Sequence, residues 1–388
     1  MKITDIRTFL MNASAPGKPS WRHWLFVKVY TNDGLYGVGE CWGWPHVVER
    51  AIHELKPLII GENPQNIERL WQKMFAAVMS HGMTGVVGSG AITGIEMALW
   101  DIKGKALSTP VWNLLGGKMR DRIRLYGHAF NMERAHELVE RGFTGLKLFG
   151  WQNCLSRVES LRKTFGPDID LMVDTGGGPW QTPRDAIALG RSLEPYALLF
   201  YEDPVSSLNT EAVAKVSNAV NIPIAIGESH PNIYALAPLI EREIIDVAQP
   251  DTGRFGGLSQ MRKLSAIAET HFVMIAPHNG SLGPVAEIAA VHLMATIPNF
   301  LIQEHLVDDV PQRYNVMSGQ PNIVDGHIIV PNSPGLGIDI DEKVVIQNPP
   351  NSQQSLPSVE SASEYDFQYV GAHYKRARWL EGCTEGWG

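Results

Sequence analysis

The chain has 388 residues, of which 44% are hydrophobic and 19% are charged, which is the balance of a globular protein and not of a disordered one. This length predicts at least two domains, since a single β/α barrel takes up only about 200 to 250 residues. With 33 basic and 41 acidic residues the formal net charge is −8, which excludes an overall basic field that would attract nucleic acid or an anionic membrane. An anionic substrate would need local cations, most simply a metal ion.

The cysteines and the N-terminus indicate the compartment. Cys41, Cys154 and Cys383 form neither a zinc-type spacing nor a disulfide framework, which fits a reducing environment. The first residues lack the long apolar core of a signal peptide, and the chain has no run of about 18 apolar residues. We therefore expect a cytoplasmic protein that spans no membrane.

Residues 1–118 predict an α+β domain. Ile3–Leu10, His23–Tyr30 and Leu35–Glu40 are strand-like runs, and the last two are joined by Asp33-Gly34, a strong hairpin-turn signal. From His46 to about Leu115 the apolar residues recur with a helical period instead. The domain thus begins with a meander of three strands and continues as helices.

Residues 119–320 predict a β/α barrel. Short apolar runs recur at intervals of 22 to 29 residues, and each is followed by a turn and a helical stretch. The eight runs are Ile123–Tyr126, Gly145–Phe149, Ile169–Val173, Leu198–Tyr201, Ile222–Ile226, Ile244–Val247, Phe272–Ile275 and Phe300–Gln303. Eight such repeats favour a (β/α)8 barrel or a close variant. A doubly wound sheet is the alternative, although no glycine-rich dinucleotide fingerprint follows the early strands.

Two segments follow the barrel. Residues 321–348 contain a small return strand near Gly326–Pro331, and residues 349–388 form a tail or linker whose first half is rich in Pro, Ser and Gln. The end of the tail combines aromatic and basic side chains. In a chain with this net charge we expect them to pack on the protein's own surface or on another subunit, and not on nucleic acid.

Three successive predicted strands each end in a carboxylate. Asp174, Glu202 and Glu228 are 28 and then 26 residues apart, so a barrel would bring them together at the carboxyl ends of its strands. Three anions in a poorly solvated site repel one another, and a divalent cation with oxygen ligands, such as Mg²⁺, relieves that repulsion. The alternative is three ordinary polar strand ends. We favour the metal site because all three are in phase.

The next strand ends add a candidate base. Asp251 and His278 are 27 residues apart, so adjacent strands would pair them. A carboxylate bonded to one imidazole nitrogen fixes the tautomer and raises the basicity of the other nitrogen. Glu304 closes the last predicted strand, where it could hydrogen-bond a substrate carboxylate or its enolate.

Together these residues resemble the enolase superfamily, mandelate racemase subgroup. Gly94–Lys105 is similar to the family's signature helix and Pro334–Gly337 to its closing segment, so that the resemblance covers the chain to about Asp341. It implies a modified (β/α)7β barrel under an N-terminal capping domain, with residues 321–348 returning to that domain. It also implies Mg²⁺ on Asp174, Glu202 and Glu228, and a His278–Asp251 dyad that abstracts the proton α to a carboxylate.

Two departures from the subgroup narrow the activity. Where a racemase carries the second lysine of a Lys-x-Lys motif, this chain has Phe149, which cannot transfer a proton. Where some sugar-acid dehydratases carry a histidine after the first metal ligand, this chain has Thr175 and then three glycines. Lys147 remains, either as support for the substrate carboxylate or as a salt-bridge partner of the carboxylate cluster.

The resemblance also implies that loops of the capping domain fold over the barrel mouth and contribute to substrate binding. Each such residue could equally be ordinary loop packing. The candidate substrate-binding residues are Trp21, Arg22, Trp42, His46, His128, His230 and Asn279.

One well-formed dyad suits a single-base β-elimination, and the segment after Ala276 is most similar to galactonate- and mannonate-type dehydratases. We therefore expect an Mg²⁺-dependent dehydratase of an aldonic or aldaric acid, assembled as a homo-oligomer. Two alternatives are open. The first is an epimerase, racemase or cycloisomerase of a hydroxy acid or lactone, and the second is a catalytically silent family member that only binds a ligand.

Overall fold

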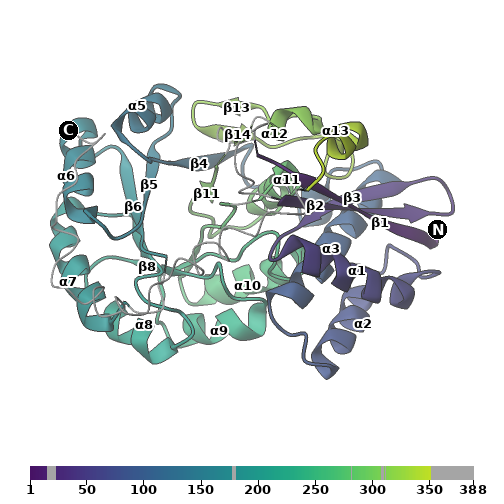
Figure 1. The fold of residues 1–388 in the computed structure, drawn as a ribbon, viewed down its shortest axis with the longest axis horizontal. Coiled ribbons are helices and arrows are strands. Elements are labelled where there is room, and N and C mark those ends of the chain that lie inside the picture. The colour runs from purple at the N-terminus through teal and green to yellow at the C-terminus, as the bar shows by residue number, and fades with distance from the viewer. Residues whose placement is uncertain (15–22, 177–180, 281, 307–309, 311, 351–388) are drawn as a thin grey trace.

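The computed structural model describes residues 1–14, 23–176, 181–280, 282–306, 310 and 312–350. Trp21, Arg22 and all but the first two residues of the segment 349–388 therefore lie outside the described residues. Figure 1 shows two units side by side, an N-terminal sheet with its helices and a larger ring of strands and helices. None of the described helices combines the length and the hydropathy needed to cross a membrane.

The N-terminal meander is confirmed. β1 (Ile3–Asn12), β2 (His23–Thr31) and β3 (Tyr36–Cys41) form an antiparallel sheet in that order. The helices that follow are α1 (Pro45–Ile59), α2 (Ile67–Ser80), α3 (Val86–Ala106) and α4 (Val111–Leu114). α3 packs directly on β3, because a Cβ atom at Gly39 would lie 2.0 Å from the Gly94 carbonyl oxygen. Only glycine permits this approach.

Eight parallel strands follow, and each overlaps its predicted run. They are β4 (Arg122–His128), β5 (Gly145–Phe149), β6 (Asp170–Asp174), β7 (Phe200–Glu202), β8 (Ile224–Ile226), β9 (Val247–Ala248), β10 (Met274–Ile275) and β11 (Gln303–Glu304). The connecting helices are α5 (Met132–Glu140), α6 (Cys154–Phe165), α7 (Pro183–Leu193) with the short 3-10 helix η1 (Glu194–Tyr196), α8 (Thr210–Ser217), α9 (Ile233–Glu241), α10 (Leu258–Thr270) and α11 (Pro284–Met294).

The hydrogen bonds run round the strands as a ring. β4 to β10 pair in chain order, and β11 pairs in parallel with β4. A parallel bridge between Ile275 and Phe300 joins β10 to the segment that leads into β11. Among the residues that the structure describes, no outer helix of the same kind follows the last strand, so the ring has the (β/α)7β form. The predicted barrel is confirmed and the doubly wound alternative is wrong.

The strands β6 to β11 all begin later than their apolar runs, and β10 and β9 show the reason. Phe272 is 94% exposed with φ of 57°, and the strand begins only at Met274. Ile244 and Ile245 belong to the apolar core of the molecule but precede the strand, which begins at Val247. Hydrophobic residues in the turn before a strand are hard to separate from the strand itself when only sequence is read.

The segment after the barrel returns to the N-terminal sheet. β13 (Ile323–Val324) and β14 (His327–Ile329) form a hairpin, and β14 pairs antiparallel with β4. The remaining elements are α12 (Gln312–Asn315), β12 (Met317–Ser318), β15 (Asp339–Ile340) and α13 (Glu342–Gln347). Lys28 of β2 donates to Glu342 of α13 at 2.7 Å. The chain thereby ties the two units together a second time.

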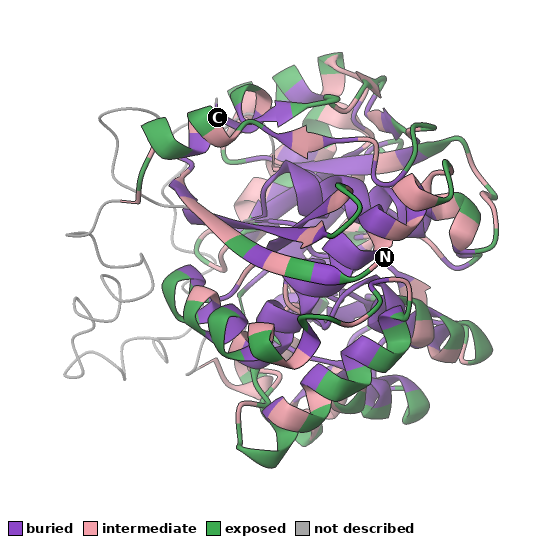
Figure 2. Cartoon of the chain, turned by 90° about the vertical axis from the view of Figure 1, so that its right-hand side faces the viewer, coloured by how far each residue is buried: buried purple, intermediate pink, exposed green. Residues whose placement is uncertain are grey.

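Two buried carboxylates of the N-terminal unit hold helices of the barrel. Glu96 of α3 accepts the backbone N–H groups of Leu258 and Ser259 at 2.9 Å each, at the first turn of α10. Glu40 of β3 accepts those of Val285 and Ala286 at 3.0 Å each, at the first turn of α11. Helix N-termini carry unpaired N–H groups and partial positive charge, which a carboxylate satisfies. Figure 2, seen from the side of the N-terminal unit, shows buried residues in the middle of the molecule and exposed residues mainly on the outer helices.

Candidate active site

The alternation of side chains along the strands places one polar layer inside the ring. An apolar interior cluster contains one residue from seven of the eight strands or their immediate extensions: Tyr126, Met172, Phe200, Ala225, Val247, Ala276 and Ile302. Side chains two positions further along a strand point the same way. For all eight strands that rule gives His128, Lys147, Asp174, Glu202, Gly227, Gln249, His278 and Glu304. The inner layer therefore changes from apolar to polar towards the carboxyl ends.

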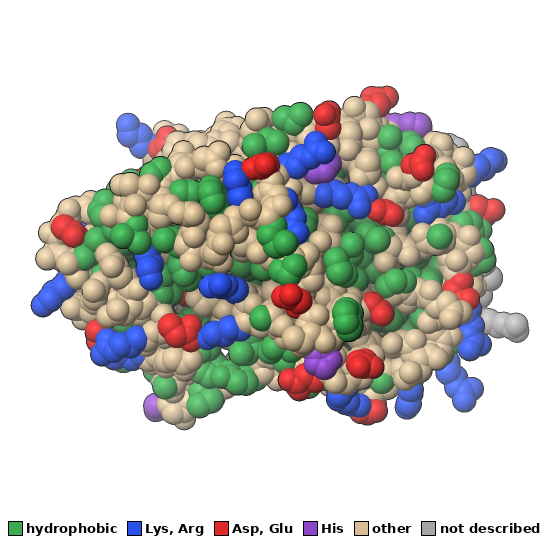
Figure 3. All heavy atoms as spheres, turned by 180° about the vertical axis from the view of Figure 1, so that it is seen from behind, with side chains coloured by type: hydrophobic (Ala, Val, Ile, Leu, Met, Phe, Trp, Pro, Cys, Tyr) green, Lys and Arg blue, Asp and Glu red, His purple; other side chains and the backbone are tan. Residues whose placement is uncertain are grey.

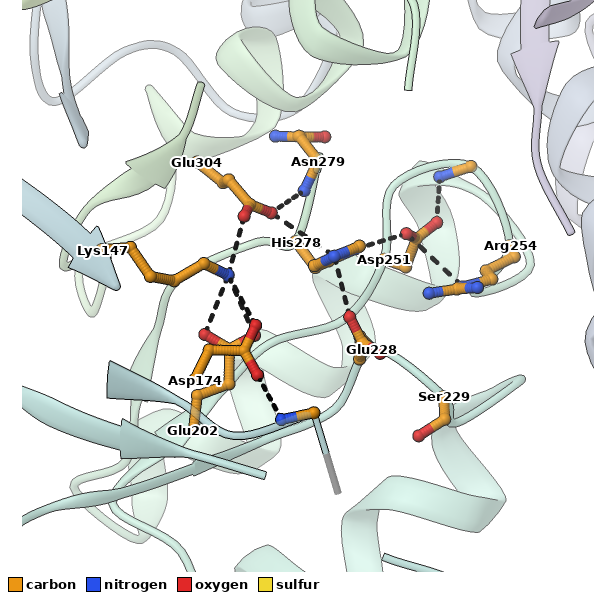
Figure 4. Close-up of polar contacts among 12 residues, drawn as sticks. Lys147, Asp174, Glu202, Glu228, Ser229, Asp251, Arg254, His278, Asn279 and Glu304 are labelled. Atoms are coloured by element: carbon orange, nitrogen blue, oxygen red, sulfur yellow. Dashed lines mark hydrogen bonds and ion pairs between the residues drawn. The ribbon is translucent and has the colours of Figure 1, made fainter. Parts of the chain in front are cut away.

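Lys147 lies at the centre of the acidic side of this layer (Figure 4). Its Nζ lies 3.1 Å from Glu202 Oε2, 2.8 Å from Glu304 Oε1 and 3.4 Å from Asp174 Oδ2. The ammonium group is 1% exposed. Lys147 thus makes the salt bridges expected with the carboxylate cluster, and its expected support of a substrate carboxylate stays a prediction.

Burial dominates the electrostatics of the carboxylates. Burial and the neighbouring charge of Asp174 raise the pKa of Glu202 to about 8, against the lowering effect of Lys147. Burial also raises the pKa of Asp174. Burial alone would raise the pKa of Glu228 too, but the charge of His278 and its hydrogen bond lower it to about 2. Without a further positive charge beside Lys147, burial thus favours the protonated forms of Glu202 and Asp174.

The donor set of this cluster fits a hard divalent cation. Asp174, Glu202 and Glu228 offer carboxylate oxygens from three consecutive strand ends, and the first two are buried. Among the described residues, no three His, Cys, Asp or Glu side chains are already gathered around one metal position. The reason lies in the contacts: Lys147 bonds Glu202, and His278 Nε2 draws Glu228 away at 2.8 Å.

His278 and Asp251 form the expected pair. The Nδ1 of His278 lies 2.6 Å from Asp251 Oδ2, and the two residues form a parallel bridge between neighbouring strand ends. Asp251 is fully buried and also accepts the Gly253 N–H at 2.8 Å. Arg254 Nε lies 3.4 Å from the same carboxylate. Burial alone would lower the pKa of His278. The neighbouring carboxylates Glu304, Glu228 and Asp251 nevertheless raise this pKa well above its ordinary value.

Gly280 leaves space beside the reactive side of this imidazole. A Cβ atom at Gly280 would lie 3.0 Å from His278 Nε2 and 3.4 Å from both carboxylate oxygens of Glu304. Any larger residue would crowd the nitrogen that faces the barrel interior. His278 Nε2 and Glu304 Oε2 lie 3.5 Å apart, and the glycine keeps the space beside both of them free of a side chain.

Glu304 contacts four groups, and one of them is His278 Nε2 at 3.5 Å from its Oε2. His128 Nε2 lies 2.6 Å from its Oε1, the Asn279 N–H donates to its Oε2 at 2.8 Å, and Lys147 completes the set. Burial alone would raise its pKa, but Lys147, His278 and His128 lower the pKa of Glu304 well below its ordinary value. Burial lowers the pKa of His128. Glu304 is thus an anion positioned at the last strand end.

The other candidate substrate-binding residues are spread more widely. The Trp42 N–H donates to the Gly253 carbonyl, two residues after Asp251, so this tryptophan reaches the barrel mouth. His46 contacts His23, within the N-terminal unit, at 3.3 Å. His230 is buried behind β8, and burial lowers its pKa to about 4. The amide of Asn279 has no hydrogen-bond partner among the described residues.

Phe149 lies at the rim, where its side chain is 58% exposed. Its register partner on β6 is Asp174. A Cβ atom at Gly176 would lie 3.4 Å from the Phe149 ring, so this phenylalanine packs against the start of the glycine segment. The position offers an aromatic edge and no proton donor.

Two contacts of the site were missed from sequence. Arg254 follows Asp251 by three residues, a spacing that could have suggested an ion pair with it. Glu40, which orders the helix after the His278 segment, is 238 residues distant from His278 in the chain, and no local pattern connects the two.

Comparison with known families matches both units of the chain. Residues 14–116 match the mandelate racemase / muconate lactonizing enzyme N-terminal domain, and residues 131–344 match the enolase C-terminal domain-like family. The first match covers β2, β3 and α1–α4, and the second covers β5 to β11 with their helices.

Three similar proteins illustrate the range of activities in these matches. A D-galactonate dehydratase of Verminephrobacter eiseniae is 34% identical over 376 residues, which are 89% of this chain and 94% of that protein. The structure of a Pantoea ananatis enolase with bound D-gluconate and Mg has a TM-score of 0.81 at 32% identity, covering 90% of this chain and 95% of the other. The 3,6-anhydro-D-galactonate cycloisomerase of Zobellia galactanivorans has a TM-score of 0.84 at 30% identity, covering 90% and 100%.

Proposed function

Because the chain belongs to the mandelate racemase / muconate lactonizing enzyme family of the enolase superfamily, we propose that it is a metal-dependent dehydratase of a sugar acid. It removes the proton α to the carboxylate and the hydroxyl on the β-carbon, and the product is a 2-keto-3-deoxy acid. The similarity to D-galactonate dehydratases and to a gluconate-bound structure supports this substrate class.

The observation that carries the proposal is the His278–Asp251 pair at 2.6 Å. Asp251 holds Nδ1, so Nε2 faces the barrel interior as the base, next to the space that Gly280 leaves. Across the mouth, Phe149 occupies the position where a racemase needs a second base. A single base on one face suits elimination better than inversion.

The reaction balances with His278 alone as the proton carrier. Nε2 takes the α-proton, and the electrons of the C–H bond form the enolate of the carboxylate. The imidazolium then returns that proton to the β-hydroxyl, which leaves as water while the Cα–Cβ double bond forms. The resulting enol tautomerises to the 2-keto acid. Lys147 and Glu304 keep their positions throughout and orient the carboxylate end of the substrate.

Asp174, Glu202 and Glu228 are the residues that would hold the metal, which we propose to be Mg²⁺. When bound, the cation supplies positive charge that stabilises the negative charge developing on the substrate carboxylate. It also gives these acids the countercharge that they lack, which explains why so much carboxylate is buried in one place.

A screen of aldonic and aldaric acids tests the proposal. We expect at least one acid to give a 2-keto-3-deoxy product, detected as its semicarbazone, and only when Mg²⁺ is present. If no acid in the library is turned over with Mg²⁺, the proposal fails.

The similarity to a cycloisomerase supports isomerisation of an acid or lactone as a second candidate function. In that case the enzyme would exchange the α-proton with solvent or open a ring without releasing water. Incubation of each acid in D₂O separates the two: incorporation of deuterium with no keto product favours isomerisation. Binding of an acid with neither exchange nor turnover favours the silent family member.

A further inference from the structure

One buried amide in the polar layer has no partner. Gln249 is 0% exposed, and neither its Nε2 nor its Oε1 makes a hydrogen bond within the described residues. A buried polar group left unpaired costs about 1 to 3 kcal/mol, and an amide has both a donor and an acceptor to satisfy. Native proteins rarely leave a whole amide in that state.

Register places Gln249 on the inner face at the height of the site. Val247, two residues earlier, belongs to the apolar interior cluster, so Gln249 points into the ring as well. On one side its neighbour is Gly227, which has no side chain; a Cβ there would lie 2.6 Å from the Gln249 backbone. On the other side Ile275 pairs with Ala248, which puts the small Ala276 beside Gln249. Neither neighbour therefore offers the buried amide a side-chain hydrogen-bond partner.

The charged members of the layer satisfy one another, and Gln249 does not take part. His128, Lys147 and Glu304 form one connected set, and Lys147 extends it to Asp174 and Glu202. His278 pairs with Asp251 and Glu228. The neutral amide of Gln249 is left without a partner two residues before Asp251. A suitable partner is an uncharged group that can both donate and accept a hydrogen bond, and a sugar hydroxyl is such a group.

We propose that Gln249 is a substrate-recognition residue, whose amide hydrogen-bonds a hydroxyl of the sugar acid beside the carbons that react at His278. This inference rests on the proposed function and adds a specificity determinant to it. A site with a buried amide aimed at one hydroxyl discriminates strongly against the analogue that lacks it, because the amide is then left unpaired.

The test is a substitution crossed with substrate analogues. Gln249→Met keeps the length of the side chain and removes both hydrogen-bonding atoms. Wild type and variant are assayed on the best sugar acid and on its mono-deoxy analogues at each position beyond C3. We expect the variant to lose about ten- to a hundredfold in kcat/KM on the parent acid. For one deoxy analogue the two enzymes should differ by less than about threefold, since the partner hydroxyl is already missing.

Gln303→Met is the matched control. Gln303 is the same residue type and is also 0% exposed, but it faces α11, where its Nε2 donates to the Glu287 carbonyl at 3.3 Å. We expect Gln303→Met either to leave kcat/KM unchanged or to lower it by the same factor for the parent acid and for all analogues. Thermal unfolding of both variants checks that they are folded.

The outcomes separate this inference from the proposed function. If wild type turns over sugar acids and Gln249→Met lowers kcat/KM by the same factor for the parent acid and for every analogue, Gln249 has a structural role. The inference is then overturned, while the proposed function stands. If wild type turns over no acid, calorimetry with D-galactonate and D-gluconate on wild type and Gln249→Met decides. Binding that the variant loses supports recognition by Gln249, and absence of binding overturns both proposals.

Discussion

At the residue scale, His278 has a carboxylate on each ring nitrogen: Asp251 on Nδ1 at 2.6 Å and Glu228 on Nε2 at 2.8 Å. Only Nε2 can serve as the base, because Asp251 is fully buried and tied to the Gly253 N–H. Under the proposed function Glu228 would be one of the residues that hold the metal, and its contact with Nε2 would have to open before that nitrogen could take a proton from the substrate. The Glu228 contact and the proton transfer thus exclude each other.

The proposed roles of His278 and Asp251 predict which of the two substitutions lowers the activity more. His278→Asn keeps part of the shape of the side chain and removes the base, so it should lose elimination and α-deuterium exchange together, by at least about a thousandfold. Asp251→Asn leaves the imidazole in place but removes the charge that orients it and favours its protonation, so the loss should be smaller. Rates of exchange in D₂O and of keto-acid formation measure both.

Circular dichroism and Mg²⁺ binding serve as controls, since both variants should fold and bind metal. If His278→Asn retained substantial exchange, another residue would be the α-base. If it kept exchange and lost elimination, His278 would act only as the acid, and the single-base mechanism would be wrong.

Sequence reading found charged residues at this scale better than neutral ones. Asp174, Glu202, Asp251 and His278 follow apolar runs at barrel spacing, so their proximity could be predicted from the strand repeat alone. Gln249 occurs in the same pattern, two residues before Asp251, but an amide carries no charge that singles it out. Its importance becomes visible only when burial and missing partners are known.

At the element scale, the two carboxylates of the N-terminal unit act as caps for helices of another unit. Glu40 accepts two N–H groups of α11, and burial raises the pKa of Glu40 to about 7 despite these bonds and the charge of Arg313. In the unfolded chain the same group has its ordinary value near 4.5. Folding thus favours the protonated form of Glu40.

The sign of the resulting pH dependence follows from linkage. A raised pKa in the folded state means that the contribution of Glu40 to stability is largest below pH 4.5 and is lost as the pH rises through 7. Glu40→Gln removes this titration. The difference in free energy of unfolding, wild type minus variant, should therefore fall between pH 4.5 and 8 by up to about 3 kcal/mol. Denaturant titrations across that range measure it.

Glu54→Gln, on the exposed face of α1, is the control and should leave the pH profile of wild type unchanged. If Glu40→Gln shows the same profile as wild type, Glu40 remains ionised in the folded state, and its hydrogen bonds to the first turn of α11 outweigh the effect of burial on its pKa.

The existence and order of the helices and strands could largely be predicted from sequence, but the residues at which they begin and end could not. The meander and the eight runs follow from hydrophobic period and turn residues. The true starts of β9 and β10 depend on turns such as that at Phe272, whose left-handed conformation no apolar pattern reveals. Caps such as Glu40 and Glu96 connect residues far apart in the chain, so they could not be read from local sequence at all.

At the scale of the whole molecule, the net charge of −8 is spread and not concentrated. On the face in Figure 3, acidic and basic side chains are interspersed. The strongest local imbalance among the groups described is instead internal, around Asp174 and Glu202. A cation bound there should stabilise the whole fold, since a ligand that binds only the folded state shifts the unfolding equilibrium.

We therefore expect Mg²⁺ to raise the melting temperature, with a stabilisation of about 2.7 kcal/mol when its concentration is 100 times Kd. Glu202→Gln should weaken Mg²⁺ binding more than about tenfold and flatten this response, and it should abolish α-proton exchange as well as elimination. Calorimetric scans with MgCl₂, compared with KCl at equal ionic strength, measure the shift. A variant that exchanged the α-proton at the wild-type rate would show that the metal site is elsewhere.

The caps made by Glu40 and Glu96 also bear on how such proteins can be recombined. Each carboxylate lies in the N-terminal unit and accepts N–H groups of a barrel helix. Exchanging the N-terminal unit for that of a relative therefore replaces the acceptor of each contact and keeps the donors. A hybrid whose donor lacked an acid at either position would leave buried N–H groups unpaired beside the segment that carries His278. The two units are thus inherited as a matched pair, and new substrate preferences are more easily gained by changing loops and inner-layer residues than by shuffling whole units.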